Sequence, residues 1–276
     1  MSEESLNFSA SRLKLIDDCF GKYHFKYIKK IPVDQIIWPG TIRGSVLHRI
    51  LEESVLMKLD KIDNETILQS VKGKFTLYFE EMKADKTKGK FTKSRTYKPD
   101  EYNEQGEKAA IIFTRFVINY FHDIKNAFPE LKIEAKYEFE DNVNINGIID
   151  LPVLTWEDKL RIIDFKTTSD SNKWYFVLFK EDIQKLMYFY LGWKHFQKFS
   201  EGFDYLVYNI DEKNIFFQSI NYVEEVADYK TFFEPLTQRI RTLKFLHNNA
   251  DEKYYNPNKE SCKWCDFKHI CPKAIK

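Results

Sequence analysis

The clearest hydrophobic pattern in the chain lies between residues 146 and 168. Two apolar runs, Ile148–Leu154 and Leu160–Phe165, flank the polar segment Thr155–Lys159. Branched and aromatic residues bounded by turn-forming residues are typical of strands. The pattern therefore predicts a β-hairpin in the middle of the chain.

Charged residues interrupt this apolar pattern. Asp150 lies in the first run, and Asp164 and Lys166 lie in or beside the second. Because successive side chains point to opposite faces of a strand, Asp164 and Lys166 share one face, and a turn centred near Glu157 places Asp150 opposite Asp164. The other face is predicted to be an apolar layer of Ile149, Leu151, Val153, Ile163, Phe165 and Thr167.

Apolar residues at helical or strand spacing predict the elements on both sides of the hairpin. The expected helices are Ser9 or Ser11 to Cys19, Gly44 to Leu59, Asn64 to Met82, Glu101 to Ala127, Lys180 to Phe196, and Glu224 to Asn248 with a break or kink at Pro235. The expected strands are Lys132 to Glu140, which should pair with the hairpin, Phe203 to Ile210 and Ile215 to Ile220, and residues 169–173 are expected to form a loop.

The composition limits the classes of protein to which the chain can belong. It has 276 residues, enough for one large domain or two small ones, with 43% hydrophobic residues and a net charge of +1. A balanced charge means that any nucleic-acid surface must be a local patch. The N-terminal residues are acidic, and no apolar run approaches the ~18 residues of a membrane span. We therefore expect a soluble cytoplasmic protein, bacterial, archaeal or viral, that makes no membrane contact.

The two hairpin carboxylates and the lysine admit two interpretations. Buried like charges a few ångströms apart raise each other's pKa, and a divalent cation between them makes such a pair tolerable. Carboxylate oxygens are hard ligands suited to Mg²⁺ or Mn²⁺, and a nearby lysine can face a phosphate or the attacking water. The alternative is a solvated outer strand with an Asp–Lys ion pair. The run from Arg161 to Thr167 is too apolar for a free edge, so the sequence favours a catalytic metal site.

The segment between Lys83 and Lys98 combines basic and aromatic residues. Phosphates attract such charges, and nucleic-acid bases stack on such rings. The alternative is a solvated, mobile loop. The candidate nucleic-acid-binding residues are Lys88, Lys90, Phe91, Lys93, Arg95 and Tyr97.

Three of the four cysteines, Cys262, Cys265 and Cys271, lie within ten residues of one another. A Cys-x-x-Cys turn presents two thiolates to one metal, and a third thiolate nearly completes a tetrahedral site. Recruitment of the distant Cys19 would complete the site and tie the two ends of the chain together. Zinc and a 4Fe–4S cluster both fit this spacing. Inert packing of the thiols is the alternative, and disulfides fit poorly with an intracellular chain.

Four short motifs follow one another along the chain, and together they resemble the RecB-like branch of the PD-(D/E)XK nuclease superfamily. They are G-x-x-x-H at Gly44 to His48, G-x-x-D at Gly147 to Asp150, D-x-K at Asp164 to Lys166, and Q-x-x-x-Y at Gln184 to Tyr188. Without this context, His48 would be an ordinary packed or exposed histidine, and the Gln–Tyr pair would mean little. The four cysteines resemble the subgroup with a 4Fe–4S cluster, which includes CRISPR-associated RecB-like exonucleases and AddB-type recombination nucleases.

The resemblance implies an α/β fold in which a central mixed β-sheet is flanked by helices, as in restriction endonucleases. It implies one nuclease domain over residues 1–276, with a helical and basic insertion at 60–104 and an iron–sulfur region formed by Cys19 and residues 256–276. The implied ligands of the 4Fe–4S cluster, or alternatively of a structural Zn²⁺, are Cys19, Cys262, Cys265 and Cys271.

The resemblance also implies the chemistry. The implied ligands of Mg²⁺ or Mn²⁺ are His48, Asp150, Asp164 and the main-chain carbonyl of Phe165, and the implied catalytic residues are Asp150, Asp164, Lys166, Gln184 and Tyr188. Lys166 would orient the nucleophile or stabilise the transition state, and Gln184 and Tyr188 would hold the substrate strand or the lysine.

The expected function is that of a metal-dependent DNA exonuclease acting on single strands or duplex ends, in recombination, repair or CRISPR spacer acquisition. Its expected partners are DNA and a helicase, recombination or CRISPR integration protein. The alternative is a DNA-binding or assembly module that keeps the nuclease fold and acts with a partner helicase or integrase.

Overall fold

A computed structural model describes residues 5–33, 36–85, 87, 89–93, 97–168, 182–209, 214–221, 228–263 and 265–275. The strands are β1 (Leu6–Ser9), β2 (Ile36–Ile37), β3 (Lys90–Phe91), β4 (Ile124–Ala127), β5 (Leu131–Lys136), β6 (Val143–Ile149), β7 (Leu151–Thr155), β8 (Leu160–Thr168), β9 (Gly202–Asn209) and β10 (Asn214–Asn221). The helices are α1 (Ala10–Asp18), α2 (Phe20–Tyr23), η1 (His24–Ile28), α3 (Pro39–Leu59), α4 (Asn64–Ser70), α5 (Lys74–Ala84), α6 (Pro99–Tyr120), η3 (Phe121–Asp123), α8 (Ile183–Phe196), α9 (Tyr229–Phe232), α10 (Glu234–Asn248), η4 (Glu252–Tyr254) and α11 (Lys259–Lys263).

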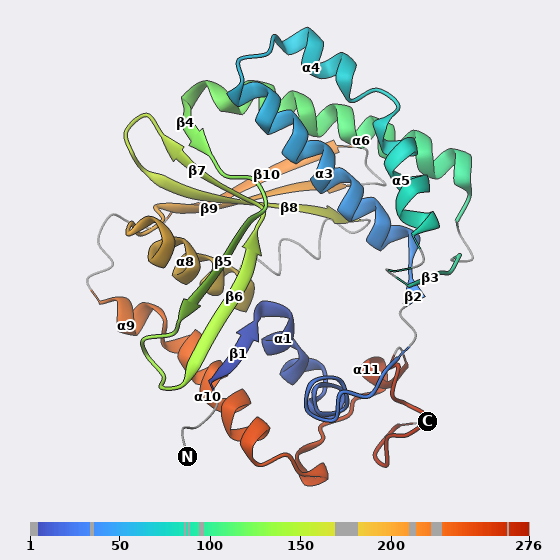
Figure 1. The fold of residues 1–276 in the computed structure, drawn as a ribbon, viewed down its shortest axis with the longest axis vertical. Helices are drawn as coiled ribbons and strands as arrows, with labels where there is room; N and C mark the ends of the chain where they lie inside the picture. The colour runs from blue at the N-terminus through green and yellow to red at the C-terminus, as the bar shows by residue number, and fades with distance from the viewer. Residues whose placement is uncertain are drawn as a thin grey trace.

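Two mixed β-sheets form the centre of the molecule, with helices on both sides (Figure 1). The larger sheet has the strand order β10-β9-β8-β7-β4, and β8 and β9 run parallel within it. The smaller sheet has the order β1-β6-β5, in which β1 and β6 are parallel. The expected α/β fold with a mixed sheet between helices is therefore confirmed.

The central hairpin is present with the predicted register. Strands β7 and β8 are antiparallel and pair Leu151 with Ile163 and Leu154 with Leu160. The pairing ends one residue after Asp150, whose Oδ2 accepts a hydrogen bond from the backbone N–H of Phe165 on β8. The first apolar run is not one continuous strand, however, because Asp150 separates β6 from β7. At this residue the chain passes from the smaller sheet into the larger one.

The larger sheet buries both of its faces, so β8 is a central strand and not a solvated edge. Helices α3, α5 and α6 pack with Leu151, Ile163 and Phe165 in one hydrophobic core. Helices α1, α8 and α10 form a second core, which includes Ile149 and Ile162. The prediction that Ile149 lies on the same apolar face as Leu151 was therefore wrong, because the change of sheet at Asp150 carries it to the other core.

Two of the predicted helices are shorter than expected. The helix expected over residues 64–82 is two helices, interrupted at Gly73, whose φ of 74° suits glycine. The helix expected to reach Ala127 ends at Tyr120, and the following residues form the edge strand β4 on β7. The break predicted at Pro235 is present, because α9 ends at Phe232 and α10 begins at Glu234, with Pro235 in its first turn.

Other boundaries differ less. Helix α3 begins at Pro39, five residues earlier than expected, because proline is well suited to a first helical turn. Strand β5 was expected to pair with the hairpin, but it pairs with β6 in the smaller sheet and meets the first apolar run only at Ile148 and Ile149. It ends at Lys136, before the chain turns through Asn142 in the left-handed conformation. Ser9 caps α1 and accepts a hydrogen bond from the backbone of Arg12, as predicted. The expected loop at 169–173 and the outer ends of three predicted elements, at 180–181, 210 and 224–227, lie outside the described residues.

Gly106 shows how closely α5 and α6 approach each other. A Cβ atom at this position would lie 2.1 Å from Cε1 of the fully buried Phe75. We expect Gly106→Ala to lower the free energy of unfolding by about 1–3 kcal/mol, because overpacking outweighs the helix preference of alanine. Urea denaturation measures this change. The matched variant Gly44→Ala meets no atom within 4 Å and should raise the stability by about 0.5–1 kcal/mol. A Gly106→Ala protein as stable as the wild type would contradict the packing.

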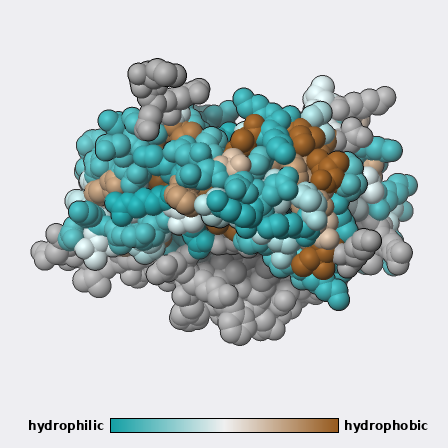
Figure 2. All heavy atoms as spheres, turned by 90° about the horizontal axis from the view of Figure 1, so that it is seen from below, coloured by the Kyte–Doolittle hydropathy of each residue, from teal (hydrophilic) through white to brown (hydrophobic). Residues whose placement is uncertain are grey.

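The N- and C-terminal segments lie together at one end of the molecule (Figure 1). The Nδ2 of Asn256 donates to the carbonyl of Ile16 at 3.1 Å, and Ser261 Oγ donates to the carbonyl of Asp18 at 3.0 Å. Seen from this end, the surface is mainly hydrophilic, with small apolar patches (Figure 2). Among the described residues, no helix combines the length and the apolarity that crossing a bilayer requires.

Candidate active site

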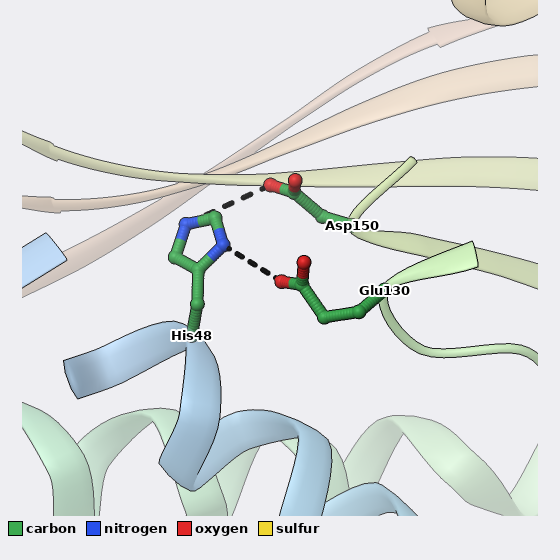
Figure 3. Close-up of side chains that lie close together, drawn as sticks. All are labelled: His48, Glu130 and Asp150. Atoms are coloured by element: carbon green, nitrogen blue, oxygen red, sulfur yellow. Dashed lines mark hydrogen bonds and ion pairs between the residues drawn. The ribbon is translucent and has the colours of Figure 1, made fainter. Parts of the chain in front are cut away.

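The break between β6 and β7 brings side chains from different parts of the fold to one point. Asp150 lies at the break, and His48 reaches it from α3 (Figure 3). The Nε2 of His48 lies 3.7 Å from Oδ2 of Asp150 and 3.2 Å from the carbonyl oxygen of Phe165. The backbone N–H of Phe165 donates to the same Oδ2 of Asp150 at 2.9 Å. The structure thus places two other predicted metal ligands, Asp150 and the carbonyl of Phe165, beside Nε2 of His48.

Asp164 and Lys166 form a buried pair on β8. The Nζ of Lys166 lies 2.6 Å from Oδ2 of Asp164, whose side chain is only 1% exposed. Burial raises the pKa of Asp164, Lys166 opposes the rise and Asp150 adds to it. Burial would lower the pKa of Lys166, but the charges of Asp164 and Asp150 outweigh it and raise the pKa. Lys166 therefore remains an ammonium group at neutral pH and compensates only part of the carboxylate charge.

Helix α8 adds Gln184 and Tyr188 from the opposite layer. The Nε2 of Gln184 donates to the hydroxyl of Tyr188 at 2.9 Å and to Oδ1 of Asp164 at 3.4 Å. Its Oε1 accepts a hydrogen bond from Lys14 of α1 at 3.0 Å, a contact that the sequence did not indicate. Burial and the nearby carboxylates raise the pKa of Tyr188, so its hydroxyl stays protonated. Gln184 thus contacts Asp164 directly and Tyr188 contacts Gln184. The predicted role of the pair toward the substrate or the lysine stays a prediction.

Glu130 is a residue of this site that the sequence did not reveal. Its Oε1 lies 3.1 Å from Nδ1 of His48. The donor atoms of His48, Glu130 and Asp150 all lie within 4.8 Å of one another (Figure 3). Glu134, an acid on the following strand β5, accepts a hydrogen bond from Asn7 on β1. No periodicity marks Glu130, which precedes β5 and has a left-handed backbone with φ of 50°.

The donor set fits a divalent cation. The predicted set combines the imidazole of His48 with the carboxylates of Asp150 and Asp164 and the main-chain carbonyl of Phe165, and these oxygen ligands suit Mg²⁺ or Mn²⁺. Burial alone would lower the pKa of His48, but Asp150 and Glu130 raise it to about 9. The carboxylates thus hold two positive charges beside them, the imidazolium of His48 and the ammonium of Lys166. A cation bound there would replace the proton on His48.

Two open spaces meet at His48. A cavity of about 210 Å³ is lined by His48, Phe165 and Lys166, among others. A groove of about 790 Å³ runs along one side of α3 and also reaches Glu130. Its lining includes Gly40, Thr41, Gly44, Ser45, Arg49, Glu52, Lys132 and Ile148. The histidine of the candidate site is therefore accessible from an open groove.

Comparison with known protein families identifies the superfamily. The family model described as PD-(D/E)XK nuclease superfamily matches residues 7–272, which is nearly the whole chain. The chain belongs to the PD-(D/E)XK nuclease superfamily. Membership implies metal-dependent cleavage of nucleic acid. It agrees with the carboxylates and the lysine that the chain brings together.

The chain is weakly similar to a solved structure titled "Crystal structure of SSO0001", with 14% identity over 96% of each chain and a TM-score of 0.38. This low similarity carries no argument about function. No curated protein matches the chain.

In this nuclease-superfamily chain, the segment predicted to bind nucleic acid is partly built into the fold. Strand β3, formed by Lys90 and Phe91, pairs with β2. The ring of Tyr97 lies 5.7 Å from that of Phe91 and 5.3 Å from that of Tyr102. Lys90 and Lys93 are exposed, whereas Lys88 and Arg95 lie outside the described residues. The half-buried rings pack against the helical layer, so the basic residues offer the simpler route to nucleic-acid contact.

All four cysteines are free thiols in the same region of the molecule. Burial raises the pKa of Cys265 and Cys271, and the charge of Cys19 adds to the rise at both. Cys262 adds a similar effect at Cys271. Cys19 therefore lies near the C-terminal cysteines, 243 positions away along the chain from Cys262. Among the described residues, however, no three cysteine sulfurs lie within 4.8 Å of one another.

Proposed function

We propose that the protein is a metal-dependent DNA exonuclease of the RecB-like branch, acting on single strands or duplex ends. The observation that carries the proposal is the meeting of His48, Asp150, Asp164 and Lys166 where the two sheets separate. The finer assignment to DNA, to exonuclease action and to the RecB-like branch rests on the order of the four motifs along the chain.

The side chains divide the work of hydrolysis. We assign His48, Asp150, Asp164 and the carbonyl of Phe165 to a catalytic Mg²⁺ or Mn²⁺. Such an ion supplies activation of water and neutralisation of the charge on the scissile phosphate. The ammonium of Lys166 orients the nucleophile or stabilises the negative charge of the transition state. Gln184 holds Asp164 in place through its amide, and Lys14 in turn fixes Gln184.

The groove beside α3 supports a polymeric substrate. It ends at His48, and small or hydroxyl-bearing residues of α3 line it together with Arg49 and Lys132. A Cβ atom on Gly40 or Gly44 would meet no other atom within 4 Å, so this side of the helix is open. A nucleic-acid strand lying in the groove would deliver its phosphates to the carboxylates and the lysine.

We also propose that the four cysteines bind a 4Fe–4S cluster, with Zn²⁺ as the alternative. Hydrolysis of a phosphodiester needs no electron transfer, so the cluster would be structural. In this scheme residues 1–276 form one domain, residues 60–104 are an insertion, and Cys19 with residues 256–276 forms the cluster region. The physiological role would be recombination, repair or CRISPR spacer acquisition, with a helicase, recombination or integration partner in the cytoplasm.

The second candidate is a DNA-binding or assembly module with a nuclease fold. A module that has lost catalysis usually loses part of its charged site. Asp150, Asp164 and Lys166 are all present, and they are held together by the contacts described above. This intact set favours the enzyme.

Cleavage of end-labelled DNA tests the proposal. The full chain should shorten labelled single-stranded DNA or duplex ends when Mn²⁺ is added, and should leave them intact with EDTA. Asp150→Asn is expected to lower the rate by at least about 100-fold, because it removes a carboxylate from the metal site. Binding of DNA without cleavage in Mn²⁺ or Mg²⁺ would reject the enzyme in favour of the binding module. Cleavage only at internal positions would reject the exonuclease assignment.

A further inference from the structure

The turn before β5 connects Glu130 to two of the candidate metal ligands. The backbone N–H of Glu130 donates to the carbonyl oxygen of Asp150 at 2.8 Å. Its side-chain Oε1 lies 3.1 Å from Nδ1 of His48, which is 82 positions earlier in the chain. Two residues before, the N–H of Phe128 donates to the carbonyl of Pro152 at 2.9 Å. Glu130 is therefore fixed to the start of β7 by its backbone and to α3 by its side chain.

The backbone of Glu130 is unusual for its residue type. Its φ of 50° lies in the left-handed region, where a residue with a Cβ atom has a cost of about 1–2 kcal/mol. A glycine or asparagine would suit this conformation better. Such backbone conformations persist where surrounding contacts hold them and are concentrated at functional sites. The glutamate side chain is the feature that glycine would not supply.

The two nitrogens of His48 face different partners. Nδ1 faces the carboxylate of Glu130, and Nε2 faces Oδ2 of Asp150 and the carbonyl of Phe165. A neutral imidazole has one protonated nitrogen and one lone pair. A carboxylate at Nδ1 selects the form with the proton on Nδ1 and the lone pair on Nε2. Histidines that bind metals commonly donate their other N–H to a carboxylate in this way.

We propose that Glu130 is a positioning residue that orients His48 for metal binding and is not itself a metal ligand. The inference rests on the proposed metal-dependent function and adds to it the residue that prepares the imidazole. One ion cannot use both ring nitrogens, because they lie on different sides of the ring. Nε2 is the nitrogen that faces Asp150 and the Phe165 carbonyl, so Glu130 lies on the wrong side of His48 for that ion. Glu130 therefore affects metal binding only through the orientation of the His48 imidazole.

Titration calorimetry with Mn²⁺ tests this role separately from cleavage. Glu130→Ala should weaken Mn²⁺ binding by the ~10- to 100-fold typical of a lost partner behind a ligand. Glu130→Gln keeps an oxygen that can accept the Nδ1 proton, and it should lose only a few-fold, since a neutral acceptor forms a hydrogen bond about half as strong. At saturating Mn²⁺ the Ala variant should recover most of the wild-type cleavage rate.

Two further variants separate the side chain from the backbone. Glu130→Gly also removes the carboxylate but relieves the left-handed conformation, so it should lose as much Mn²⁺ affinity as Glu130→Ala while unfolding at a higher temperature. The control Glu134→Gln changes an acid on the neighbouring β5 that contacts Asn7, and it should bind Mn²⁺ as the wild type does.

The possible results distinguish this inference from the proposed function. If Glu130→Gln loses as much affinity as Glu130→Ala, and saturating Mn²⁺ restores neither, Glu130 is a direct ligand and the inference is wrong. Unchanged Mn²⁺ affinity in Glu130→Ala makes it a bystander, again overturning the inference while the nuclease proposal stands. A wild-type protein that binds Mn²⁺ but cleaves no DNA would contradict the nuclease proposal and leave the inference about Glu130 unaffected. A wild-type protein that binds no Mn²⁺ overturns both.

Discussion

Replacement of Lys166 by alanine is expected to lower the rate of DNA cleavage by about 100- to 1,000-fold, the loss that follows removal of one preorganised electrostatic contact to a transition state. The Nζ of Lys166 lies 2.6 Å from the buried carboxylate of Asp164, and two acidic neighbours keep it charged. The ammonium is therefore held beside the candidate metal ligands. Initial rates of cleavage of end-labelled single-stranded DNA at saturating Mn²⁺ measure the effect.

Three controls separate catalysis from folding and binding. Alanine leaves Asp164 without its lysine, so Lys166→Gln, which keeps a neutral donor, tests whether a loss of rate follows the charge. Both variants should still bind DNA and Mn²⁺. Lys159→Ala removes a lysine that pairs with Glu157 and Glu201 on the surface, and its rate should stay within about twofold of wild type. Cleavage by Lys166→Ala within about tenfold of wild type would refute the catalytic role.

The parts of the site that depend on local pattern could be predicted from the sequence. The register of β7 and β8 follows from the two apolar runs and the short turn between them, so the pairing of Leu151 with Ile163, which brings Asp150 to β8, was predicted. Gln184 and Tyr188 share a side of α8 because they are four residues apart, and their hydrogen bond follows from that spacing.

The parts that depend on distant contacts could not be predicted. Residues Ile124–Ala127 continue a helical pattern, and they become a strand only because β7 offers its edge for pairing. Glu130 reaches His48 through a left-handed turn that precedes β5 and lies outside any regular pattern. The passage from one sheet to the other at Asp150 is also invisible in the apolar run, yet it opens the space in which His48 meets the carboxylate.

The proposed cluster makes a second large effect testable. Cys19→Ser is expected to remove most of the bound iron and to lower the melting temperature by on the order of 10 °C, the size of effect expected when a cross-link that closes a very long loop is lost. Cys19 and Cys262 are 243 positions apart, so their shared metal would restrict the unfolded chain strongly. Iron analysis and thermal unfolding of the anaerobically purified protein measure the two effects, and Cys265→Ser should match Cys19→Ser in both.

The control for this experiment weakens the contact between the N- and C-terminal segments and leaves all four cysteines in place. Ser261→Ala removes the hydrogen bond from Ser261 to the carbonyl of Asp18, so it should lose only about 1 kcal/mol and keep its iron. A brown wild-type protein whose colour disappears in Cys19→Ser would support iron, whereas a colourless protein with one zinc per chain would replace the iron–sulfur proposal by a zinc site. Wild-type iron content and an unchanged melting curve in Cys19→Ser would remove Cys19 from the ligand set. The two ends of the chain would then be held by packing and by hydrogen bonds, among them those of Asn256, Asn258 and Ser261 and that between Tyr255 and His24.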